Sequence, residues 1–420
     1  MTAPGFLLRA TITALPSAMV LASGAAPAQD RRVQPLSPPI VIAHRGASGE
    51  RPEHTLAAYE LAIAQGADVI EPDLVPTKDN ILVARHENEI GATTNVAAHP
   101  RFAARQTTKV IDGQPVTGWF TEDFTLAELK TLRARERIPA LRPANVAHDG
   151  RYQVPTLAEI ITLAKKHGVG IYPETKHPTY FAAVGHPTDR LLVDQLHGAG
   201  WTTADAPVFI QSFEVANLKR IAAMTKLRLI QLLDARGGPA DGSVASYAAM
   251  ATPAGLADIA RYAWGIGPNK AMLGDGALVR DAHGAGLRVH AWTFRAENQF
   301  LAAGFVRGDD PAGHGDLAGE IMAALRLGID GFFTDFPQIG AQAIGPRDAS
   351  SSASPAPDHR LRVDRDLDRE GTVPGGGEGG RLDHDQPVGS RPQLRPQDAQ
   401  GGGARGQGAQ GVGKEVPKVA

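Results

Sequence analysis

The chain has 420 residues, which is enough for one large domain or two domains of ordinary size. Its 43 lysine and arginine residues nearly balance its 45 aspartate and glutamate residues, and the formal net charge of -2 gives no reason to expect nucleic acid or an anionic membrane surface as a partner. Cysteine is absent, so disulfides, thiol catalysis and thiolate metal sites are excluded, and any metal must be held by oxygen or imidazole.

The first residues have the pattern of an export signal. Arg9 supplies a positive charge, Thr11–Ala22 form a short and mostly apolar stretch, and residues 26–28 (APA) fit a small-residue cleavage site. Residues 1–28 are therefore predicted to be a signal peptide. No later stretch reaches the roughly 20 apolar residues that span a bilayer. We expect a soluble protein, periplasmic or secreted, with no stable membrane insertion.

The other end of the chain has a different composition. Aromatic residues are absent after Phe336, and from Ala349 onward the chain consists largely of Gly, Pro, Gln, Ser, Asp and Arg. Such a segment cannot bury enough apolar surface to offset the entropy lost on ordering. Residues 349–420 are therefore predicted to be a disordered tail.

Between the two ends, short β-rich runs alternate with helical patterns. Most runs are apolar on both faces, as is typical of buried parallel strands. The strand candidates are 40–43, 68–74, 81–84, 170–173, 208–212, 227–233, 289–293 and 331–334, with 262–267 as a weaker candidate. About eight β-α repeats in roughly 300 residues predict an α/β fold, a (β/α)8 TIM barrel over residues 39–345. A doubly wound sheet is the alternative that the alternation alone does not exclude.

Two helices and an insertion complete this plan. One helical pattern opens at Pro52 and closes on Gly66. A second opens at Thr156, with Glu159 at the spacing of a capping box. The stretch of about 90–152 follows the third strand-like segment and interrupts the rhythm, with one helical pattern near residues 125–133. We interpret it as an insertion that caps one end of the barrel.

Ionisable side chains stand where several of the apolar runs end. Glu71 and Asp73 are two residues apart on one strand, so their carboxylates face the same way and repel each other unless a cation lies between them. Glu174 and Lys176 repeat this spacing at the end of a later strand. Oxygen ligands of this kind suit Ca²⁺, Mg²⁺ or Mn²⁺. Solvated acids and a plain Glu–Lys ion pair are the alternatives that each motif alone leaves open.

Two histidines follow apolar runs in the same region. His44 and His86 each stand at a strand end, where one imidazole can accept a proton while the other donates one. Arg45 adds a guanidinium, which suits a phosphate group. Catalytic groups of TIM barrels gather at the C-terminal ends of the strands. Together with the carboxylates and Lys176, these residues indicate a phosphodiesterase site in one barrel mouth.

The stretch that carries most of these residues resembles the opening of glycerophosphodiester phosphodiesterases, specifically of the periplasmic bacterial type. It runs from residue 43 to residue 90 and reads AHRGASGERPEHTLAAYELAIAQGADVIEPDLVPTKDNILVARHENEI. The later segments GIYPETK, FIQSFE, VHAWTFR and DGFFTDFP are similar to later barrel strands of that family and occur in the same order. The resemblance covers about 39–340 and includes an insertion after the second histidine.

The resemblance implies a (β/α)8 barrel that hydrolyses glycerophosphodiesters to sn-glycerol 3-phosphate and an alcohol. Position by position, it implies acid/base roles for His44 and His86, and phosphate contacts for Arg45 and Lys176. It also implies one divalent cation, usually Ca²⁺ in the periplasmic type with Mg²⁺ possible, and its ligands would be Glu71, Asp73 and Glu174. Many relatives have Asp directly after the second histidine, where this chain has Glu87.

Other strand-end residues are candidates for the substrate pocket. Phe213 and Trp292 are predicted to contact the glycerol carbons, with core packing as the alternative for each. Gln211 and Ser212 also end a strand and could line the pocket. His290 is predicted to be a structural hydrogen-bonding residue.

Two other functions remain open at this point. A phospholipase D-like enzyme of the same fold would act on lysolipids or sphingolipids and would need an apolar surface near the mouth. The insertion contains Trp119, Phe120 and Phe124, but acidic residues interleave them. A non-catalytic protein that binds phosphate esters is the second alternative. Head-group preference and oligomeric state are not decided by the sequence.

Overall fold

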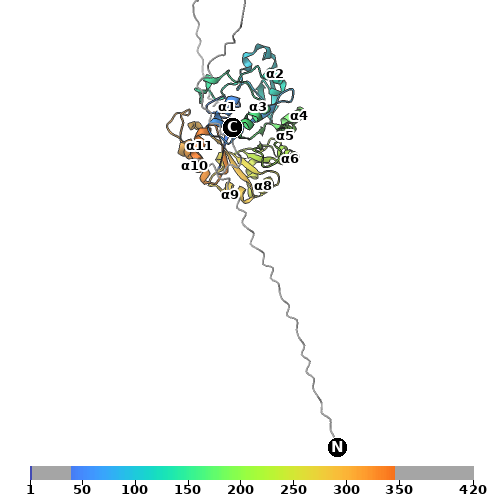
Figure 1. Ribbon diagram of the computed structural model, residues 1–420, viewed down its shortest axis with the longest axis vertical. Helices are drawn as coiled ribbons and strands as arrows, with labels where there is room; N and C mark the ends of the chain where they lie inside the picture. Colours follow the sequence, from blue (N-terminus) through green and yellow to red (C-terminus); the bar gives the residue numbers. More distant parts are fainter. Residues whose placement is uncertain (2–38, 346–420) are drawn as a thin grey trace, which may run out of the picture. The chain divides into compact units, whose positions relative to one another are not determined.

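The computed structural model describes Met1 and residues 39–345, and all statements below concern that part of the chain. The predicted signal peptide and tail lie outside the described residues. The described residues form a barrel of parallel strands with helices distributed around it (Figure 1). None of the described helices is long and apolar enough to cross a membrane.

The strands close into the predicted (β/α)8 TIM barrel. β1 pairs in parallel with β2 on one side and with β13 on the other, which joins the first strand to the last. Prolines divide two barrel strands, so β2 and β3 are the halves of one strand and β7 and β8 the halves of the next. The barrel strands are β1 (Ile40–His44), β2 (Val69–Glu71) with β3 (Asp73–Pro76), β7 (Gly170–Ile171) with β8 (Glu174–Thr175), β9 (Phe209–Ser212), β10 (Arg228–Leu233), β11 (Gly265–Pro268), β12 (Arg288–Phe294) and β13 (Gly331–Thr334).

The helices lie outside the barrel and cover the apolar outer face of its strands. Their bounds are α1 (Leu56–Ala64), α2 (Leu126–Leu129), α3 (Leu157–His167), α4 (Pro178–Ala183), α5 (Thr188–Gly198), α6 (Val215–Met224), α7 (Tyr247–Met250), α8 (Pro253–Ile259), α9 (Ala277–Gly284), α10 (Leu317–Arg326) and α11 (Pro337–Ile344). The capping box predicted for α3 is present, with Thr156 and Glu159 bonded reciprocally and Gly168 left-handed at the C-terminus. α1 begins later than predicted, because Thr55 rather than Pro52 supplies its N-terminal cap.

One predicted barrel strand is wrong. β4 (Leu82–Ala84) pairs antiparallel to β3, and β11 takes its place as a barrel strand. The reason is the short connection between β3 and β4, since a parallel neighbour needs a crossover of about a dozen residues or more. In such a hairpin the second strand runs back alongside the first, toward the point where the first strand began. β4 therefore carries His86 back toward Asp73, and the Arg85 N–H donates to the Asp73 carbonyl at 2.9 Å.

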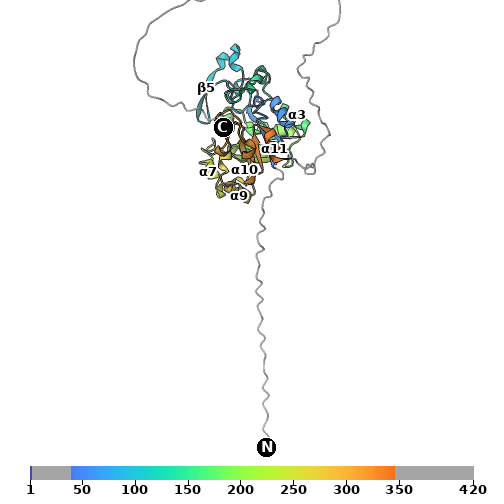
Figure 2. The same cartoon turned by 90° about the vertical axis from the view of Figure 1, so that its left-hand side faces the viewer.

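The insertion forms a small layered unit on one side of the domain, away from α9 (Figures 1 and 2). It contains the antiparallel hairpin of β5 (Thr107–Ile111) and β6 (Gln114–Gly118), and α2. α2 is shorter than the predicted 125–133 helix, although its capping box between Thr125 and Glu128 is present. A separate cluster of buried side chains joins the insertion to the β3–β4 hairpin: Val75, Val83, Ile90, Val96, Phe102, Phe124, Leu129, Leu132, Val154 and Phe181.

The barrel interior is filled by side chains rather than open. Tyr172, Phe209 and Phe333 stack or meet edge to face with ring centroids about 5 Å apart: 5.1 Å and 4.9 Å from Tyr172. His290 lies among these rings, and its Nδ1 is 2.9 Å from the Tyr172 hydroxyl. This placement below the mouth agrees with the structural role predicted for His290.

Candidate active site

Strand register brings the predicted metal-binding acids together. In the parallel pairs, His44 is the partner of Glu71, Asp73 is the partner of Glu174, and Glu174 is the partner of Gln211. One carboxylate oxygen from each of Glu71, Asp73 and Glu174 lies within 4.8 Å of the others. All three acids are buried, with 1–5% of their surface exposed. They form the floor of the C-terminal barrel mouth.

The charges of this acidic cluster are only partly balanced by the protein. Burial and the neighbouring Asp73 raise the pKa of Glu71 well above its ordinary value. Burial also raises the pKa of Glu174 to about 8, although Lys176 opposes the rise. Asp73 is different: burial opposes its ionisation, but Lys176 and His54 hold its pKa well below the usual range. Crowded acids of this kind bind a cation or hold protons.

One oxygen of the cluster supports a cation site. Asp73 Oδ1 is buried and has no hydrogen-bond partner among the described residues. Its other oxygen, Oδ2, lies 3.0 Å from His54 Nε2. Hydrogen bonds also fix Glu71, whose oxygens accept from the Arg45 N–H at 2.8 Å and from Gln211 Nε2 at 2.9 Å. An all-oxygen set with a buried, unpaired carboxylate oxygen fits a hard divalent cation such as Ca²⁺ or Mg²⁺.

His44 stands at the end of β1, beside a sharp turn. Its Nδ1 lies 2.6 Å from Asp335 Oδ1, at the end of the adjacent strand β13. Burial and the neighbouring Arg45 lower the pKa of His44 to about 4, so the ring is neutral at neutral pH. The turn after it needs Gly46, because φ is 88° there and a Cβ would lie 2.7 Å from the Ala58 carbonyl carbon of α1.

Arg45 points into the same cluster. Its guanidinium pairs with Glu53 at 3.2 Å and with Asp73 at 3.3 Å, and only 4% of its surface is exposed. It therefore stands at the edge of the acidic cluster.

His86 reaches the mouth from β4. Its Nδ1 lies 2.5 Å from Glu87 Oε1, and its Nε2 lies 3.2 Å from Lys176 Nζ. Lys176 in turn pairs with Glu174 at 2.8 Å. Burial and Arg45 lower the pKa of His86 to about 3. The second histidine is thus connected to the acidic cluster through one lysine.

The two predicted aromatic residues lie side by side. The rings of Phe213 and Trp292 meet edge to face with centroids 5.7 Å apart. Lys176 Nζ lies 5.7 Å from the centroid of Phe213, and Tyr247 contacts the other side of that ring at 5.9 Å. Trp292 is fixed by a hydrogen bond from its indole N–H to the Gly267 carbonyl at 2.7 Å. Both rings are half-buried, so they form an apolar wall beside Lys176.

Several residues of the mouth were not predicted from the sequence. Asp335 follows an apolar strand just as Glu71 does, so the strand-end rule could have found it. His54 and Glu53 lie in the turn before α1, where nothing in the periodicity marks them. Arg137 and Arg142 come from the insertion and pair with acids far away in sequence, which no local pattern reveals. Arg137 pairs with Glu53 and Glu87. Arg142 pairs with Asp335 and Glu297.

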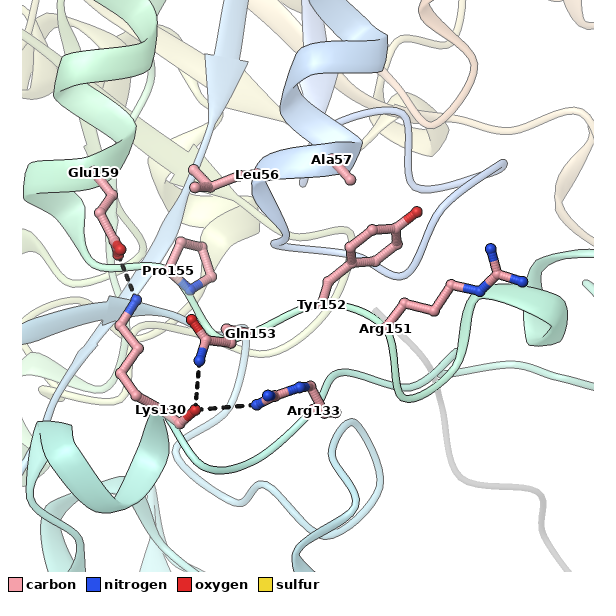
Figure 3. A pocket seen from close by; sticks show the side chains of 9 residues that line it. All are labelled: Leu56, Ala57, Lys130, Arg133, Arg151, Tyr152, Gln153, Pro155 and Glu159. Atoms are coloured by element: carbon pink, nitrogen blue, oxygen red, sulfur yellow. Dashed lines mark hydrogen bonds and ion pairs between the residues drawn. The ribbon is translucent and has the colours of Figure 1, made fainter. Parts of the chain in front are cut away.

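A cavity of about 350 Å³ lies apart from this mouth (Figure 3). It is formed between the insertion and the first turns of α1 and α3, and its lining residues are Leu56, Ala57, Lys130, Arg133, Arg151, Tyr152, Gln153, Pro155 and Glu159. Lys130 is already paired with Glu159 at 2.6 Å, and the Arg133 guanidinium donates to the Lys130 carbonyl at 3.1 Å. The predicted catalytic and metal-binding residues all lie elsewhere.

Relatives of known structure share the fold. A phosphodiesterase from Oleispira antarctica, solved in complex with the product sn-glycerol-3-phosphate, matches with a TM-score of 0.52 and 23% identity, over 73% of this chain and 96% of that one. A protein from Silicibacter pomeroyi matches with a TM-score of 0.55 and 22% identity, over 73% and 94% of the two chains. These likenesses show the barrel fold.

Sequence comparison identifies the family. A glycerophosphodiester phosphodiesterase of Arabidopsis thaliana is 36% identical over 323 residues, which is 71% of this chain and 84% of the relative. One of Haemophilus influenzae is 29% identical over 348 residues, covering 73% and 89%. The model of the glycerophosphoryl diester phosphodiesterase family matches residues 44–339, from the first histidine to α11. This chain therefore belongs to the glycerophosphoryl diester phosphodiesterase family and is an enzyme of that class.

Proposed function

We propose that this enzyme hydrolyses glycerophosphodiesters to sn-glycerol 3-phosphate and an alcohol, with one divalent cation and acid/base catalysis by His44 and His86. The observation that carries the proposal is the convergence on one mouth of three buried carboxylates, two histidines and two basic side chains, Arg45 and Lys176. The relative from Oleispira antarctica was solved with sn-glycerol-3-phosphate, which supports the product that we propose.

The cation would be held by Glu71, Asp73 and Glu174, and we propose Ca²⁺ as the ion, with Mg²⁺ as the alternative. When bound, such a cation offsets negative charge on the phosphoryl oxygens as the transition state forms. Gln211 and the Arg45 N–H hold the Glu71 carboxylate in place for this purpose. His54 holds Asp73 in the same way at 3.0 Å.

Arg45 and Lys176 would bind the phosphate. A guanidinium donates from a planar fork, while an ammonium acts as a compact charge. In the structure both are balanced by acids of the cluster, since Arg45 pairs with Asp73 and Lys176 with Glu174. A cation on those acids would leave the two basic groups available to the phosphate oxygens. Phe213 and Trp292 would contact the carbon skeleton of the substrate.

The two histidines would divide the proton transfers between them. In each ring Nδ1 is bonded to a carboxylate, which assigns the reaction to Nε2. His86 Nε2 lies 3.2 Å from Lys176 Nζ, so Lys176 would turn to the phosphate when His86 acts. We propose that His44 Nε2 accepts the proton of the attacking oxygen and that His86 Nε2 donates a proton to the leaving alkoxide. A bound anionic diester would favour the protonated form of His86, because it offsets the positive charges of Arg45 and Lys176.

We also propose that the enzyme works outside the cytoplasm, as the periplasmic type does. The support is the pattern of residues 1–28, with one basic residue, an apolar stretch and a small-residue site. Expression of the full chain in a Gram-negative host followed by fractionation tests this. We expect a mature N-terminus at Gln29 in the periplasmic fraction, and an unprocessed cytoplasmic chain would contradict it.

An assay panel tests the proposed reaction. The enzyme would be incubated with glycerophosphocholine, glycerophosphoethanolamine, glycerophosphoglycerol and glycerophosphoinositol, each with Ca²⁺ or with chelator. We expect sn-glycerol 3-phosphate to form from at least one diester, and only with metal. Product formation from sphingomyelin or lysophosphatidylcholine instead would favour the phospholipase D-like alternative. Binding of these esters without turnover would favour the non-catalytic one.

A further inference from the structure

One segment of the insertion contacts the supporting acids of both histidines. This segment, residues 136–145, carries Arg137 and Arg142 five residues apart. Both arginine side chains are largely buried, with 16% and 7% of their surface exposed. Buried arginines are kept in place by several partners at once, and each of these two has its own set of acids.

Arg142 holds the acid behind His44. Its guanidinium pairs with Asp335 Oδ2 at 2.5 Å, while Asp335 Oδ1 lies 2.6 Å from His44 Nδ1. The other donors of Arg142 reach Glu297 at 2.6 Å and the Ser48 carbonyl at 2.8 Å. Asp335 is thus bonded to the imidazole through Oδ1 and to the insertion through Oδ2, and Oδ2 also pairs with Arg295 Nε of the barrel at 3.1 Å.

Arg137 holds the acid behind His86 in the same way. It makes two parallel contacts to Glu87, at 2.9 and 2.7 Å, and Glu87 Oε1 lies 2.5 Å from His86 Nδ1. It makes two more contacts to Glu53, at 2.8 and 2.6 Å. Because Glu53 also pairs with Arg45, one guanidinium supports both a histidine and a phosphate-binding residue.

We propose that Arg137 and Arg142 are positioning residues that set the tautomer and orientation of His86 and His44 through Glu87 and Asp335, so that docking of the insertion organises both histidines together. The proposal rests on the proposed catalytic function of those histidines. A carboxylate fixed at Nδ1 keeps the proton on that nitrogen and directs Nε2 toward the substrate. Without Arg137, Glu87 loses both of its bonds to the insertion. Without Arg142, Asp335 Oδ2 keeps its ion pair with Arg295 Nε at 3.1 Å, which does not tie it to the insertion.

The chemistry of the contacts explains why arginine is needed. A planar guanidinium with five donors can bond two carboxylates at once, which the single ammonium of lysine cannot do in the same geometry. Glu87 is otherwise an exposed-rim side chain with 36% of its surface accessible, so Arg137 is its main restraint. The segment itself is anchored to the barrel by Asn145, whose Nδ2 donates to the Ser48 carbonyl at 3.2 Å.

The test uses the full chain with Arg137→Gln, Arg137→Lys, Arg142→Lys and Arg142→Gln, and Arg135→Gln as the matched control. Arg135 lies in the same stretch, but its side chain is 51% exposed and its ion pair with Asp149 is 3.6 Å long. Nitrogen-15 NMR of the histidine rings reports which nitrogen carries the proton without any need for turnover. Kinetics on glycerophosphocholine and on a glycerophosphoryl nitrophenyl ester report the consequence.

We expect the Arg137 variants to lose the single Nδ1–H tautomer of His86, and the Arg142 variants that of His44. The value of kcat should fall about 10- to 100-fold while KM changes less, as is typical when a supporting partner is removed. Arg137 variants should lose more on glycerophosphocholine than on the nitrophenyl ester, and Arg142 variants should lose equally on both. Arg135→Gln should match the wild type in every measurement.

A separate variant controls for misfolding caused by the loss of Arg142. Loss of Arg142 leaves Glu297 buried without its partner, so the double variant Arg142→Gln/Glu297→Gln removes that charge as well. Unchanged tautomers in folded Arg137 and Arg142 variants would overturn the proposal, whatever happens to kcat. If the wild type hydrolysed no diester, the ring tautomers would still decide the positioning role, so the two failures remain distinguishable.

Discussion

At the scale of single residues, the proposed proton transfers depend on which nitrogen of each histidine faces the substrate. Carboxylates occupy Nδ1 of His44 and His86, at 2.6 and 2.5 Å. Burial together with Arg45 lowers the pKa of both rings, to about 4 and about 3. Both rings are therefore neutral in the free enzyme, and the one that donates must gain its proton in the complex with an anionic substrate.

The leaving group of the substrate distinguishes the two histidines. The alkoxide that leaves from a choline ester needs a proton as its bond to phosphorus breaks, whereas nitrophenolate, a far weaker base, scarcely does. His86→Ala should lower kcat on glycerophosphocholine by about 100-fold or more and spare much of the activity on the nitrophenyl ester. His44→Ala should impair both substrates alike. Steady-state rates on the two esters measure this, and rescue of His44→Ala by the nitrophenyl ester would mean that the roles are exchanged.

Substitution of one acid of the cluster should weaken metal binding without lowering the stability of the metal-free protein. Glu71→Gln should weaken Ca²⁺ binding at least about tenfold in titration calorimetry and reduce turnover with it. In chelator, the same variant should melt at or above the wild-type temperature, because burial and Asp73 raise the pKa of Glu71.

A matched control for this comparison is Asp275→Asn, whose side chain is 83% exposed. It should leave both the affinity and the melting temperature unchanged. Wild-type Ca²⁺ affinity in Glu71→Gln would place the cation elsewhere.

At the scale of secondary-structure elements, the β3–β4 hairpin and the insertion add side chains to the candidate active site at the barrel mouth. The hairpin returns His86 to the level of Asp73, and residues 136–145 of the insertion pair with acids of the mouth through Arg137 and Arg142. One buried carboxyl in that segment is Glu136, which accepts from the Ile138 N–H at 2.9 Å and from the Asn145 amide. Burial raises its pKa to about 7.

Docking of this segment should therefore depend on pH. A carboxyl whose pKa is raised in the folded state stabilises the fold fully below its unfolded value, near 4.5, and loses that contribution as the pH rises to about 7. Glu136→Gln stays neutral, and its amide can donate to Asn145 Oδ1, which has no partner among the described residues. The melting temperature of Glu136→Gln relative to the wild type should thus rise by several degrees between pH 4.5 and 7.5. This corresponds to a change of up to about 3 kcal/mol in the difference between their free energies of unfolding.

Thermal unfolding monitored by circular dichroism across that pH range measures the difference. Glu159→Gln, in the capping box of α3, is a useful comparison because its pKa is lowered by Lys130 and Thr156 despite some burial. Its melting temperature relative to the wild type should not rise with pH over the same range. A constant difference for Glu136→Gln would mean that this carboxyl is ionised in the folded protein.

At the scale of the whole molecule, the barrel closes without the C-terminal residues. β13 pairs with β1, and α11 packs beside α10 as the last described helix before residue 345. The family match also ends at residue 339. The composition of residues 349–420 provides too little apolar surface for a core to form.

A chain truncated after Arg347 should keep its activity and stability. We expect kcat within about twofold of the full chain and a melting temperature within about 1 °C, because surface substitutions and truncations that remove no buried contacts have small effects. Turnover of the preferred diester and differential scanning calorimetry provide the two measurements. A clear drop in either would show that the tail contacts the barrel.

The sequence by itself determined the fold class and most of the ionisable side chains that meet at the mouth. Apolar runs alternating with helical patterns predicted the barrel, because buried parallel strands are apolar on both faces. The strand-end rule selected His44, Glu71, Asp73 and Glu174, since residues at the ends of parallel strands meet at one edge. Two-residue spacing placed paired side chains on one face. These are local regularities, and a local pattern can be read from one stretch of chain.

Only the tertiary structure decided which distant side chains complete the site. The short β3–β4 connection made an antiparallel hairpin where a barrel strand was predicted, and the weaker strand candidate at 262–267 became the barrel strand Gly265–Pro268. Asp335 meets His44 across 291 positions, and Arg142 meets Asp335 across 193. Such contacts depend on barrel closure and on how the insertion packs. No periodicity encodes them, because each buried charge needs a partner to offset the cost of its desolvation, and here that partner is far away in sequence.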